Sequence, residues 1–153
     1  MYFVIVILLM LVLPVASIVA EAIRFPHAHE PVFLIAKWFV FWAVGVRLFL
    51  AGIRQVLQPR FTAEEIFNIR DSSSFSIVRE LGFANLSMGL LAIGTILEPS
   101  WTIPAATVGG LYYGLAGAGH IAHKSRNAKE NVAMISDVLI FLLLLFCVLR
   151  SLP

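Results

Sequence analysis

Charged residues and cysteines are scarce in this sequence, and both scarcities exclude classes of protein. Charged residues make up 13% of the 153 positions, whereas soluble domains usually carry about 25%. The net charge is only +2, and no basic cluster is interleaved with aromatic residues, so we expect no nucleic-acid partner. Cys147 is the single cysteine and can form no internal disulfide, which excludes a disulfide-stapled secreted fold.

Motifs of common enzyme chemistry are also missing. The sequence contains no glycine-rich phosphate loop, no G-x-S-x-G and no H-E-x-x-H. His120 and His123 have H-x-x-H spacing, and Glu130 could be a third ligand. Metal binding needs three or four converging ligands whose orientation is fixed by further hydrogen bonds. We therefore predict no metal site and no cofactor, and we expect a non-enzymatic role more than an enzymatic one.

Hydrophobic residues, in contrast, are abundant: they make up 60% of the chain, and its mean hydropathy is +0.93. Five runs have roughly the 20 residues that a membrane-spanning helix needs. We predict an all-α fold, a polytopic membrane helical bundle that forms a single domain over residues 1–153. The predicted spans cover about residues 1–23, 32–57, 75–97, 101–121 and 131–149.

Two local features refine this prediction. Residues 1–20 have no Lys or Arg before their apolar run, so we keep them as a spanning helix, bent at Pro14, instead of a signal peptide. Residues 58–74 are predicted to contain a short interfacial amphipathic helix. In that link Thr62 and Glu65 have capping-box spacing. The DSSS stretch after it offers hydroxyls to cap the third span.

The basic residues indicate an orientation. One predicted side carries seven Lys or Arg: Arg54, Arg60, Arg70, Arg79, Lys124, Arg126 and Lys129. The other side carries three: Arg24, Lys37 and Arg150. Because positive loops stay in the cytoplasm, we predict a multi-pass protein of the inner (plasma) membrane with its N-terminus in the cytoplasm. Tryptophans fall near the outer helix ends, as an aromatic belt would: Trp38, Trp42 and Trp101.

Polar residues converge in the predicted cytoplasmic half of the bundle. A charge at mid-membrane costs about 2.5–3.5 kcal/mol on insertion scales, so these side chains should face inward and pair. We predict pairs of Arg47 with Asp137, and of Arg54 with Glu80 or Glu130. The predicted binding or polar cluster consists of Arg47, Arg54, Glu80, Asn85, His120, His123, Asn127, Glu130 and Asp137. The same charges could instead serve as structural locks between helices.

Small residues indicate close helix packing. Gly110, Gly114 and Ala118 form a small-xxx-small stripe, which lets another helix approach closely. That helix could belong to the same chain or lie across an oligomer interface. Asn85 lies on a glycine-containing face, where a packing role is favoured over a functional one.

Two motifs carry a family resemblance. RELGFANLSMG (residues 79–89) and GHIAHKSRNAKENVAMISD (residues 119–137) resemble an uncharacterised family of small prokaryotic integral membrane proteins, classed as a domain of unknown function. The resemblance covers roughly Phe41 to the C-terminus. The helix layout is also distantly similar to that of the DoxX-like proteins, which are usually four-helix bundles. These resemblances imply a fold type and no reaction.

Three functions are compatible with these features. The leading hypothesis is a membrane protein that binds or passes a small polar solute or ion through the polar cluster. The second is a structural or accessory subunit of a membrane complex, with a homo-oligomer or a membrane partner subunit docked on the glycine stripe. The third is a membrane-embedded redox or lipid-modifying enzyme acting near His120. In each case the lipid bilayer is a partner.

Overall fold

The computed structural model describes residues 2–26, 30–122 and 128–152, with the side chains of residues 2 and 129 left out. Helices dominate these ranges, and no strand occurs in them. The elements are α1 (Tyr2–Ile7), η1 (Leu8–Val12), α2 (Leu13–Arg24), α3 (Pro31–Phe39), η2 (Val40–Val46), α4 (Arg47–Leu57), α5 (Pro59–Phe61), η3 (Thr62–Ile66), α6 (Ser74–Gly94), η4 (Pro99–Trp101), α7 (Thr102–Ala122) and α8 (Ala128–Ser151). The predicted all-α fold is confirmed.

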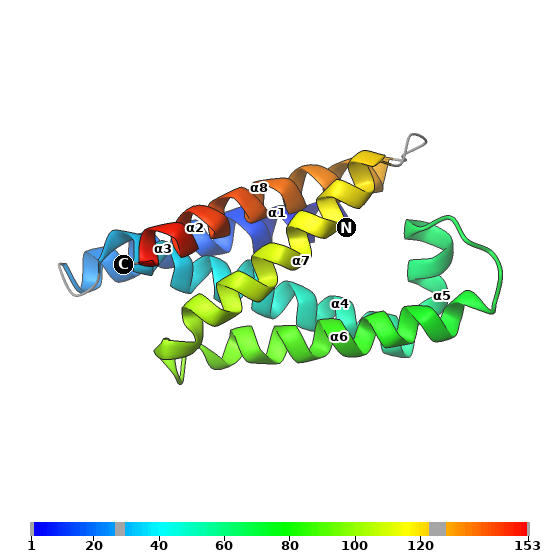
Figure 1. The fold of residues 1–153 in the computed structure, drawn as a ribbon, viewed down its shortest axis with the longest axis horizontal. Helices are drawn as coiled ribbons and strands as arrows, with labels where there is room; N and C mark the ends of the chain where they lie inside the picture. Colours follow the sequence, from blue (N-terminus) through cyan, green and yellow to red (C-terminus); the bar gives the residue numbers. More distant parts are fainter. Residues whose placement is uncertain (1, 27–29, 123–127, 153) are drawn as a thin grey trace.

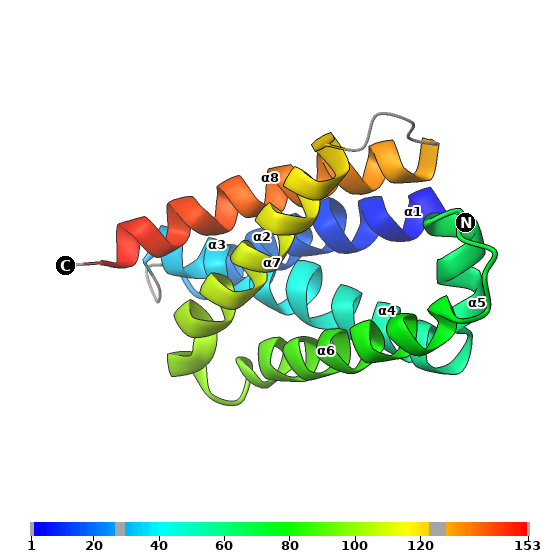
Figure 2. The ribbon, with the colours of Figure 1, turned by 45° about the vertical axis from the view of Figure 1, so that its right-hand side comes forward.

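The long helical stretches alternate in direction along the chain, and α7 crosses the long axis of the molecule obliquely (Figure 1). The first joins α1, η1 and α2, and the second joins α3, η2 and α4. Helices α6, α7 and α8 follow. The two chain ends lie at opposite ends of the bundle (Figure 2). The α5–η3 segment lies beside the far end of α4 and the start of α6, so only one end of the bundle carries this extra layer (Figures 1 and 2).

Within the described residues, four helices are long and apolar enough to cross a membrane: Phe3–Arg24, Pro31–Leu57, Ser74–Gly94 and Glu130–Ser151. The expectation of a membrane protein is therefore supported by length and composition. Helix α7 has 21 residues, but its glycines, tyrosines and histidine make it less apolar. The fifth predicted span is thus a helix of spanning length whose place in the membrane stays a prediction.

A π-helical stretch lies just before Pro14, and the bend predicted there stays a prediction. Proline has no N–H, and its ring clashes with the carbonyl four residues earlier. The π-helical residues Leu8–Val12 come directly before Leu13 and Pro14. The helix continues on the other side without interruption to Arg24, so this site modifies one long helix and does not divide it.

The predicted capping box at Thr62 is wrong. The helical segment already begins at Pro59, so Thr62 lies inside it and is buried. Proline suits the first helical position because its φ is fixed and its missing N–H would have no partner there. The predicted hydroxyl cap of α6 is also wrong, because the Ser73 side chain makes no cap bond. Instead the Asp71 carboxylate accepts from Ser73 N at 2.9 Å and from Ser73 Oγ at 2.7 Å.

Glycines bring α4 and α6 into backbone contact. A Cβ atom on Gly89 would lie 2.6 Å from the backbone nitrogen of Phe49, and one on Gly52 would lie 2.8 Å from the carbonyl oxygen of Gly82. Real side chains essentially never approach that closely. The glycine face that carries Asn85 is therefore the surface on which α6 packs against α4.

The small-residue stripe of α7 lies against α8 within the same chain. A Cβ on Gly114 would come within 2.8 Å of the Phe141 ring, and one on Gly110 within 3.4 Å of Leu144. Ala118, the third member of the stripe, is exposed. Of the two alternatives for this stripe, the structure therefore supports the intramolecular one for Gly110 and Gly114.

The largest cluster of buried apolar side chains lies mainly in one half of the bundle. Most of its residues come from η2, the end of α6, the start of α7 and the second half of α8, and they include Val40, Val44, Ala106, Ile140 and Leu144, each at most 1% exposed. This half lies away from the α5–η3 segment. In the other half the α7–α8 pair diverges from the α4–α6 pair (Figures 1 and 2).

Candidate functional site

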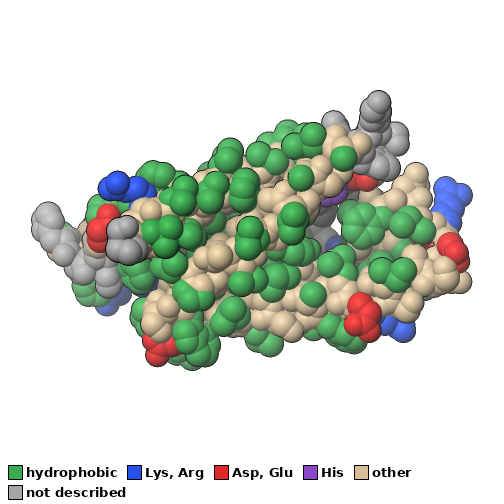
Figure 3. All heavy atoms as spheres, in the orientation of Figure 1, with side chains coloured by type: hydrophobic (Ala, Val, Ile, Leu, Met, Phe, Trp, Pro, Cys, Tyr) green, Lys and Arg blue, Asp and Glu red, His purple; other side chains and the backbone are tan. Residues whose placement is uncertain are grey.

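A cavity of about 880 Å³ occupies the half of the bundle in which the helix pairs diverge. Its walls come from α1 and η1, α4, α6, α7 and α8, and the α5–η3 segment closes its end. Most of the wall is apolar, with a few polar side chains among the aliphatic ones. The surface is visibly hollowed between the end of α7 and the α5–η3 segment, where the cavity opens (Figure 3).

An ion pair lies at the deep end of this cavity. Arg47 Nη1 lies 3.0 Å from Asp137 Oδ1, and the two side chains are 16% and 7% exposed. The Arg47 guanidinium also lies over the Tyr113 ring, 5.1 Å from its centroid. The Tyr113 hydroxyl donates to the carbonyl oxygen of Ala43. The predicted pairing of Arg47 with Asp137 is confirmed, and it joins α4 to α8.

The predicted partners of Arg54 are wrong. No ion pair joins Arg54 to Glu80 or Glu130 in the described part of the chain. Arg54 instead lies over the Phe61 ring, with Cζ 3.4 Å from the centroid. Glu80 is exposed and does not line the cavity. It precedes Asn85 by five residues, which turns it about 140° away from the face that Asn85 occupies.

Asn85 is the most deeply buried amide of the site. It is 1% exposed, and its Nδ2 donates to Gln55 Oε1 at 2.7 Å. Its Oδ1 atom is buried and has no hydrogen-bond partner among the described atoms. Gln55, on α4, was not predicted as a site residue. Its spacing of eight from Arg47 was the signal in the sequence, because positions i and i+8 belong to the same broad helical face.

The remaining predicted residues divide into two groups. His120 and Glu130 both line the cavity, and Glu130 is buried. His123 and Asn127 lie outside the described residues. Within residues 2–26, 30–122 and 128–152, no three His, Cys, Asp or Glu side chains gather closely enough to hold a metal ion. The described polar groups therefore offer hydrogen bonds and charge, with no preformed set of metal ligands among them.

The cavity ends at Arg47 and Asp137. Val44, three residues before Arg47, and Ile140, three residues after Asp137, belong to the apolar core and are at most 1% exposed. Neither residue lines the cavity. The cavity thus opens between α7 and the α5–η3 segment and is closed beyond Arg47 and Asp137 by tightly packed aliphatic side chains.

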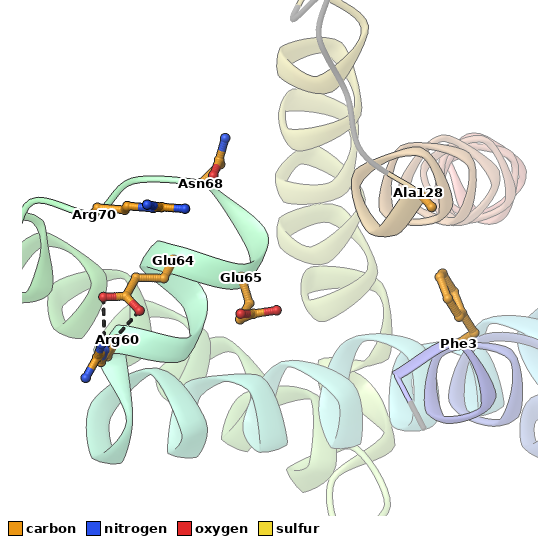
Figure 4. Close-up of a pocket in the computed structure, with 7 residues that line it drawn as sticks. All are labelled: Phe3, Arg60, Glu64, Glu65, Asn68, Arg70 and Ala128. Atoms are coloured by element: carbon orange, nitrogen blue, oxygen red, sulfur yellow. Dashed lines mark hydrogen bonds and ion pairs between the residues drawn. The ribbon is translucent and has the colours of Figure 1, made fainter.

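A second hollow lies outside the bundle, between the α5–η3 segment and the beginnings of α1 and α8 (Figure 4). Its volume is about 710 Å³. Arg60 donates through Nε to both carboxylate oxygens of Glu64 at 2.9 Å, and the Asn68 and Arg70 side chains lie above them (Figure 4). Exposed i,i+4 pairs of this kind contribute only about 0.3–0.5 kcal/mol. This hollow therefore has the character of a solvated surface more than of a binding site.

A polar staple at the opposite end of the bundle was not predicted either. Lys37 Nζ lies 2.8 Å from both carboxylate oxygens of Glu21, and Trp38 Nε1 donates to Glu21 Oε2 at 2.7 Å. One turn deeper, Trp42 Nε1 donates to Ser17 Oγ at 3.0 Å. These bonds fasten α2 to α3 and η2, and the donors and acceptors that form them are all groups of the protein.

Comparison with known proteins adds family membership and nothing about activity. No curated protein and no solved structure matches the chain. One protein family does match, and the match extends over residues 2–152. It therefore reaches well beyond the region from Phe41 onward that the two sequence motifs indicated. The chain belongs to the DUF6790 family, a family of unknown function.

Proposed function

We propose that this protein binds a small polar solute in the cavity, with the Arg47–Asp137 pair as the floor of the site. The observation that carries the proposal is that a cavity of about 880 Å³ ends on that pair. Small-molecule sites typically occupy about 300–1,000 Å³ and combine mostly apolar walls with a few convergent polar groups. Tyr112, His120 and Glu130 add further polar groups to the same wall.

Binding has more support than passage across the membrane. A route for a polar solute would have to continue beyond Arg47, because each unsatisfied polar group in an apolar environment costs several kcal/mol. Beyond that residue the side chains of Val40, Val44 and Leu144 are packed in the core. The accessory-subunit alternative has less support, because Gly110 and Gly114 already pack against α8.

We also infer five membrane spans in the inner membrane, with a cytoplasmic N-terminus. Helix α7 supports this count because it has 21 residues and crosses the bundle obliquely from the end of α6 toward the start of α8 (Figure 1). The chain ends at opposite ends of the bundle support an odd number of crossings (Figure 2). The uneven distribution of Lys and Arg supports the orientation. Reporter fusions at the two termini should report opposite compartments; the same compartment for both would overturn the five-span topology. A DoxX-like layout stays a prediction.

Cavity filling tests the proposed function. We would measure the melting temperature of the purified protein in detergent across a panel of polar metabolites and ions. A ligand present at 100 times its dissociation constant stabilises the folded state by about 2.7 kcal/mol. Leu115→Trp, on the cavity wall, should abolish the response to that ligand. Leu111→Trp is the matched control, because Leu111 lies on α7 one turn earlier, is also exposed and does not line the cavity.

Two results would count against this proposal. One is that no compound of the whole panel raises the melting temperature of the wild type. The other is a ligand that stabilises the wild type and the Leu115→Trp variant equally, because such a ligand binds somewhere else. Both variants must first show the melting temperature of the wild type without ligand, within a few degrees.

A further inference from the structure

We propose that the solute is the headgroup of an anionic phospholipid, which enters the cavity from the side while its acyl chains stay in the bilayer. This inference rests on the proposed function and deepens it by naming the ligand class. It has three supports: a guanidinium at the cavity wall, an unpartnered buried acceptor, and an opening flanked by apolar side chains.

The guanidinium belongs to Arg54. In the described part of the chain it makes no ion pair, and its contact is with the face of the Phe61 ring. Stacking uses the face of a guanidinium and leaves the N–H donors at its edge in the fork geometry that matches a phosphate. The other arginine of the cavity, Arg47, is already paired with Asp137. Arg54 is thus the cationic group best suited to receive an anionic ligand.

The acceptor is Asn85 Oδ1. The Asn85 side chain is 1% exposed, and this oxygen has no partner although Nδ2 is bonded to Gln55. A buried acceptor without a donor is unfavourable, so a ligand that supplies a hydroxyl or ammonium donor would complete it. Headgroups such as glycerol carry that donor a few bonds from the phosphate. The cavity therefore offers Arg54 to the phosphate of such a headgroup and Asn85 Oδ1 to its hydroxyl donor.

The opening faces the apolar surface of the bundle. Leu115 and Phe67 both line the cavity and are 74% and 39% exposed, and the hollow between α7 and the α5–η3 segment is visible from outside (Figure 3). Arg54 lies seven residues beyond Arg47 on α4, about 10 Å nearer the end of the bundle. That end carries the predicted interfacial segment, where lipid headgroups lie.

The acidic residues of the cavity do not oppose this arrangement. Asp137 is paired with Arg47, and Glu130 already has an interaction partner. A zwitterionic lipid such as phosphatidylcholine has a phosphate but carries a quaternary ammonium without an N–H or O–H donor. Its phosphate can therefore pair with Arg54, but the lipid offers no donor to Asn85 Oδ1.

Lipid binding to the full chain in detergent tests this inference. The probes are dioleoyl-phosphatidylglycerol, dioleoyl-phosphatidylcholine and free glycerol phosphate, titrated against wild type, Arg54→Gln, Arg79→Gln and Leu115→Trp. Arg79 is the matched control, because it is exposed on α6 and does not line the cavity. Native mass spectrometry reports bound lipid, and the melting temperature without lipid checks that each variant folds.

We expect wild type and Arg79→Gln to bind phosphatidylglycerol at least about tenfold tighter than phosphatidylcholine, because only phosphatidylglycerol supplies a hydroxyl donor to the buried Asn85 Oδ1. Arg54→Gln should weaken the binding of both lipids at least about tenfold, because both present a phosphate to this guanidinium, and Leu115→Trp should lose the binding. Unchanged binding of phosphatidylglycerol to Arg54→Gln would mean that the lipid is bound at the general surface and would overturn the inference. So would free glycerol phosphate that binds as tightly as the lipid.

The two proposals fail in different ways. If no lipid binds preferentially but a polar metabolite stabilises the wild type and not Leu115→Trp, the lipid inference is wrong and the proposed function stands. If Leu115→Trp changes the binding of neither the lipids nor the metabolites, both proposals are wrong.

Discussion

Arg47 and Asp137 are 90 positions apart in the chain, yet Arg47 Nη1 lies 3.0 Å from Asp137 Oδ1 at the floor of the cavity. Two oppositely charged side chains that are only 16% and 7% exposed stabilise each other, and removing one leaves the other largely buried without a counter-charge. The ion pair also joins α4 to α8. These helices belong to the α4–α6 pair and the α7–α8 pair, which diverge around the cavity. The ion pair therefore has a packing role and a place in the proposed site at once.

We predict that Asp137→Asn lowers the free energy of unfolding by about 3–5 kcal/mol, the usual consequence of breaking a buried ion pair. The double variant Arg47→Gln with Asp137→Asn should recover at least half of that loss, because no charge is then left uncompensated. Unfolding in denaturant, followed by tryptophan fluorescence, measures both. If the double variant is as unstable as the sum of the two single variants, the two side chains are not energetically coupled.

Gly89→Ala should destabilise the protein by about 1–3 kcal/mol, because overpacking forces neighbouring atoms apart. The added Cβ would meet the Phe49 backbone at 2.6 Å, and a backbone cannot rotate away as a side chain can. Gly119→Ala is the matched control, since nothing lies within 4 Å of its Cβ position. Gly119→Ala should leave the stability of the protein unchanged or raise it, because alanine favours helix more than glycine does. Equal melting temperatures for the two variants would contradict the close approach of α4 and α6.

The features that the sequence predicted well follow from helical spacing and hydropathy. The apolar runs located the helices, and the cost of burying charge required a partner for Arg47, which proved to be Asp137. The prediction for Glu80 failed for a reason that the sequence contained, because its position relative to Asn85 puts it on another face of α6. The cost of placing a charge in the membrane predicts burial for Glu80, whereas a charge near a helix end can reach water.

Other features depend on tertiary geometry that no local pattern encodes. Arg54 lies over Phe61 because the chain turns sharply between α4 and α5, and Gln58 makes that turn with a non-helical backbone. The divergence of α7–α8 from α4–α6 creates the cavity, and it results from where glycines allow close approach and where larger side chains do not. The bond between Glu21 and Lys37 joins α2 to α3, and predicting it would require the rotation of these two helices relative to each other, which the sequence does not specify.

Glu21→Gln should weaken the fastening of α2 to α3 by about 1–3 kcal/mol, the range for losing a hydrogen-bonded charge partner. Lys37 loses its carboxylate partner, although its side chain is 22% exposed and keeps some contact with water. Ser17→Ala removes one neutral bond, to Trp42, and should cost about 1 kcal/mol or less. Denaturant unfolding compares the two variants. A larger loss for Ser17→Ala than for Glu21→Gln would contradict the role assigned to the carboxylate.

The start of α6 should respond to pH through Asp71. The side-chain hydrogen bond from Ser73, followed by the one from the Ser73 backbone, lowers the pKa of this carboxyl below its ordinary value of 3.8. Because the folded-state pKa is the lower one, the bonds stabilise the turn above the unfolded pKa. That contribution is lost as the pH falls through the folded pKa, below 3.8. At neutral pH the stabilising contribution of these hydrogen bonds is therefore fully present.

Carboxyl-carbon NMR titration measures this pKa directly. Ser73→Ala removes the hydroxyl and keeps the backbone N–H, so the pKa of Asp71 should rise toward 3.8 without reaching it. Glu98 is an internal control, because its pKa is lowered in the same way by Ser100, in the turn at the other end of α6. Its titration should be unchanged in Ser73→Ala. If both carboxyls shift together, the change reflects the fold as a whole; if neither shifts, the Ser73 hydroxyl does not donate to Asp71 in solution.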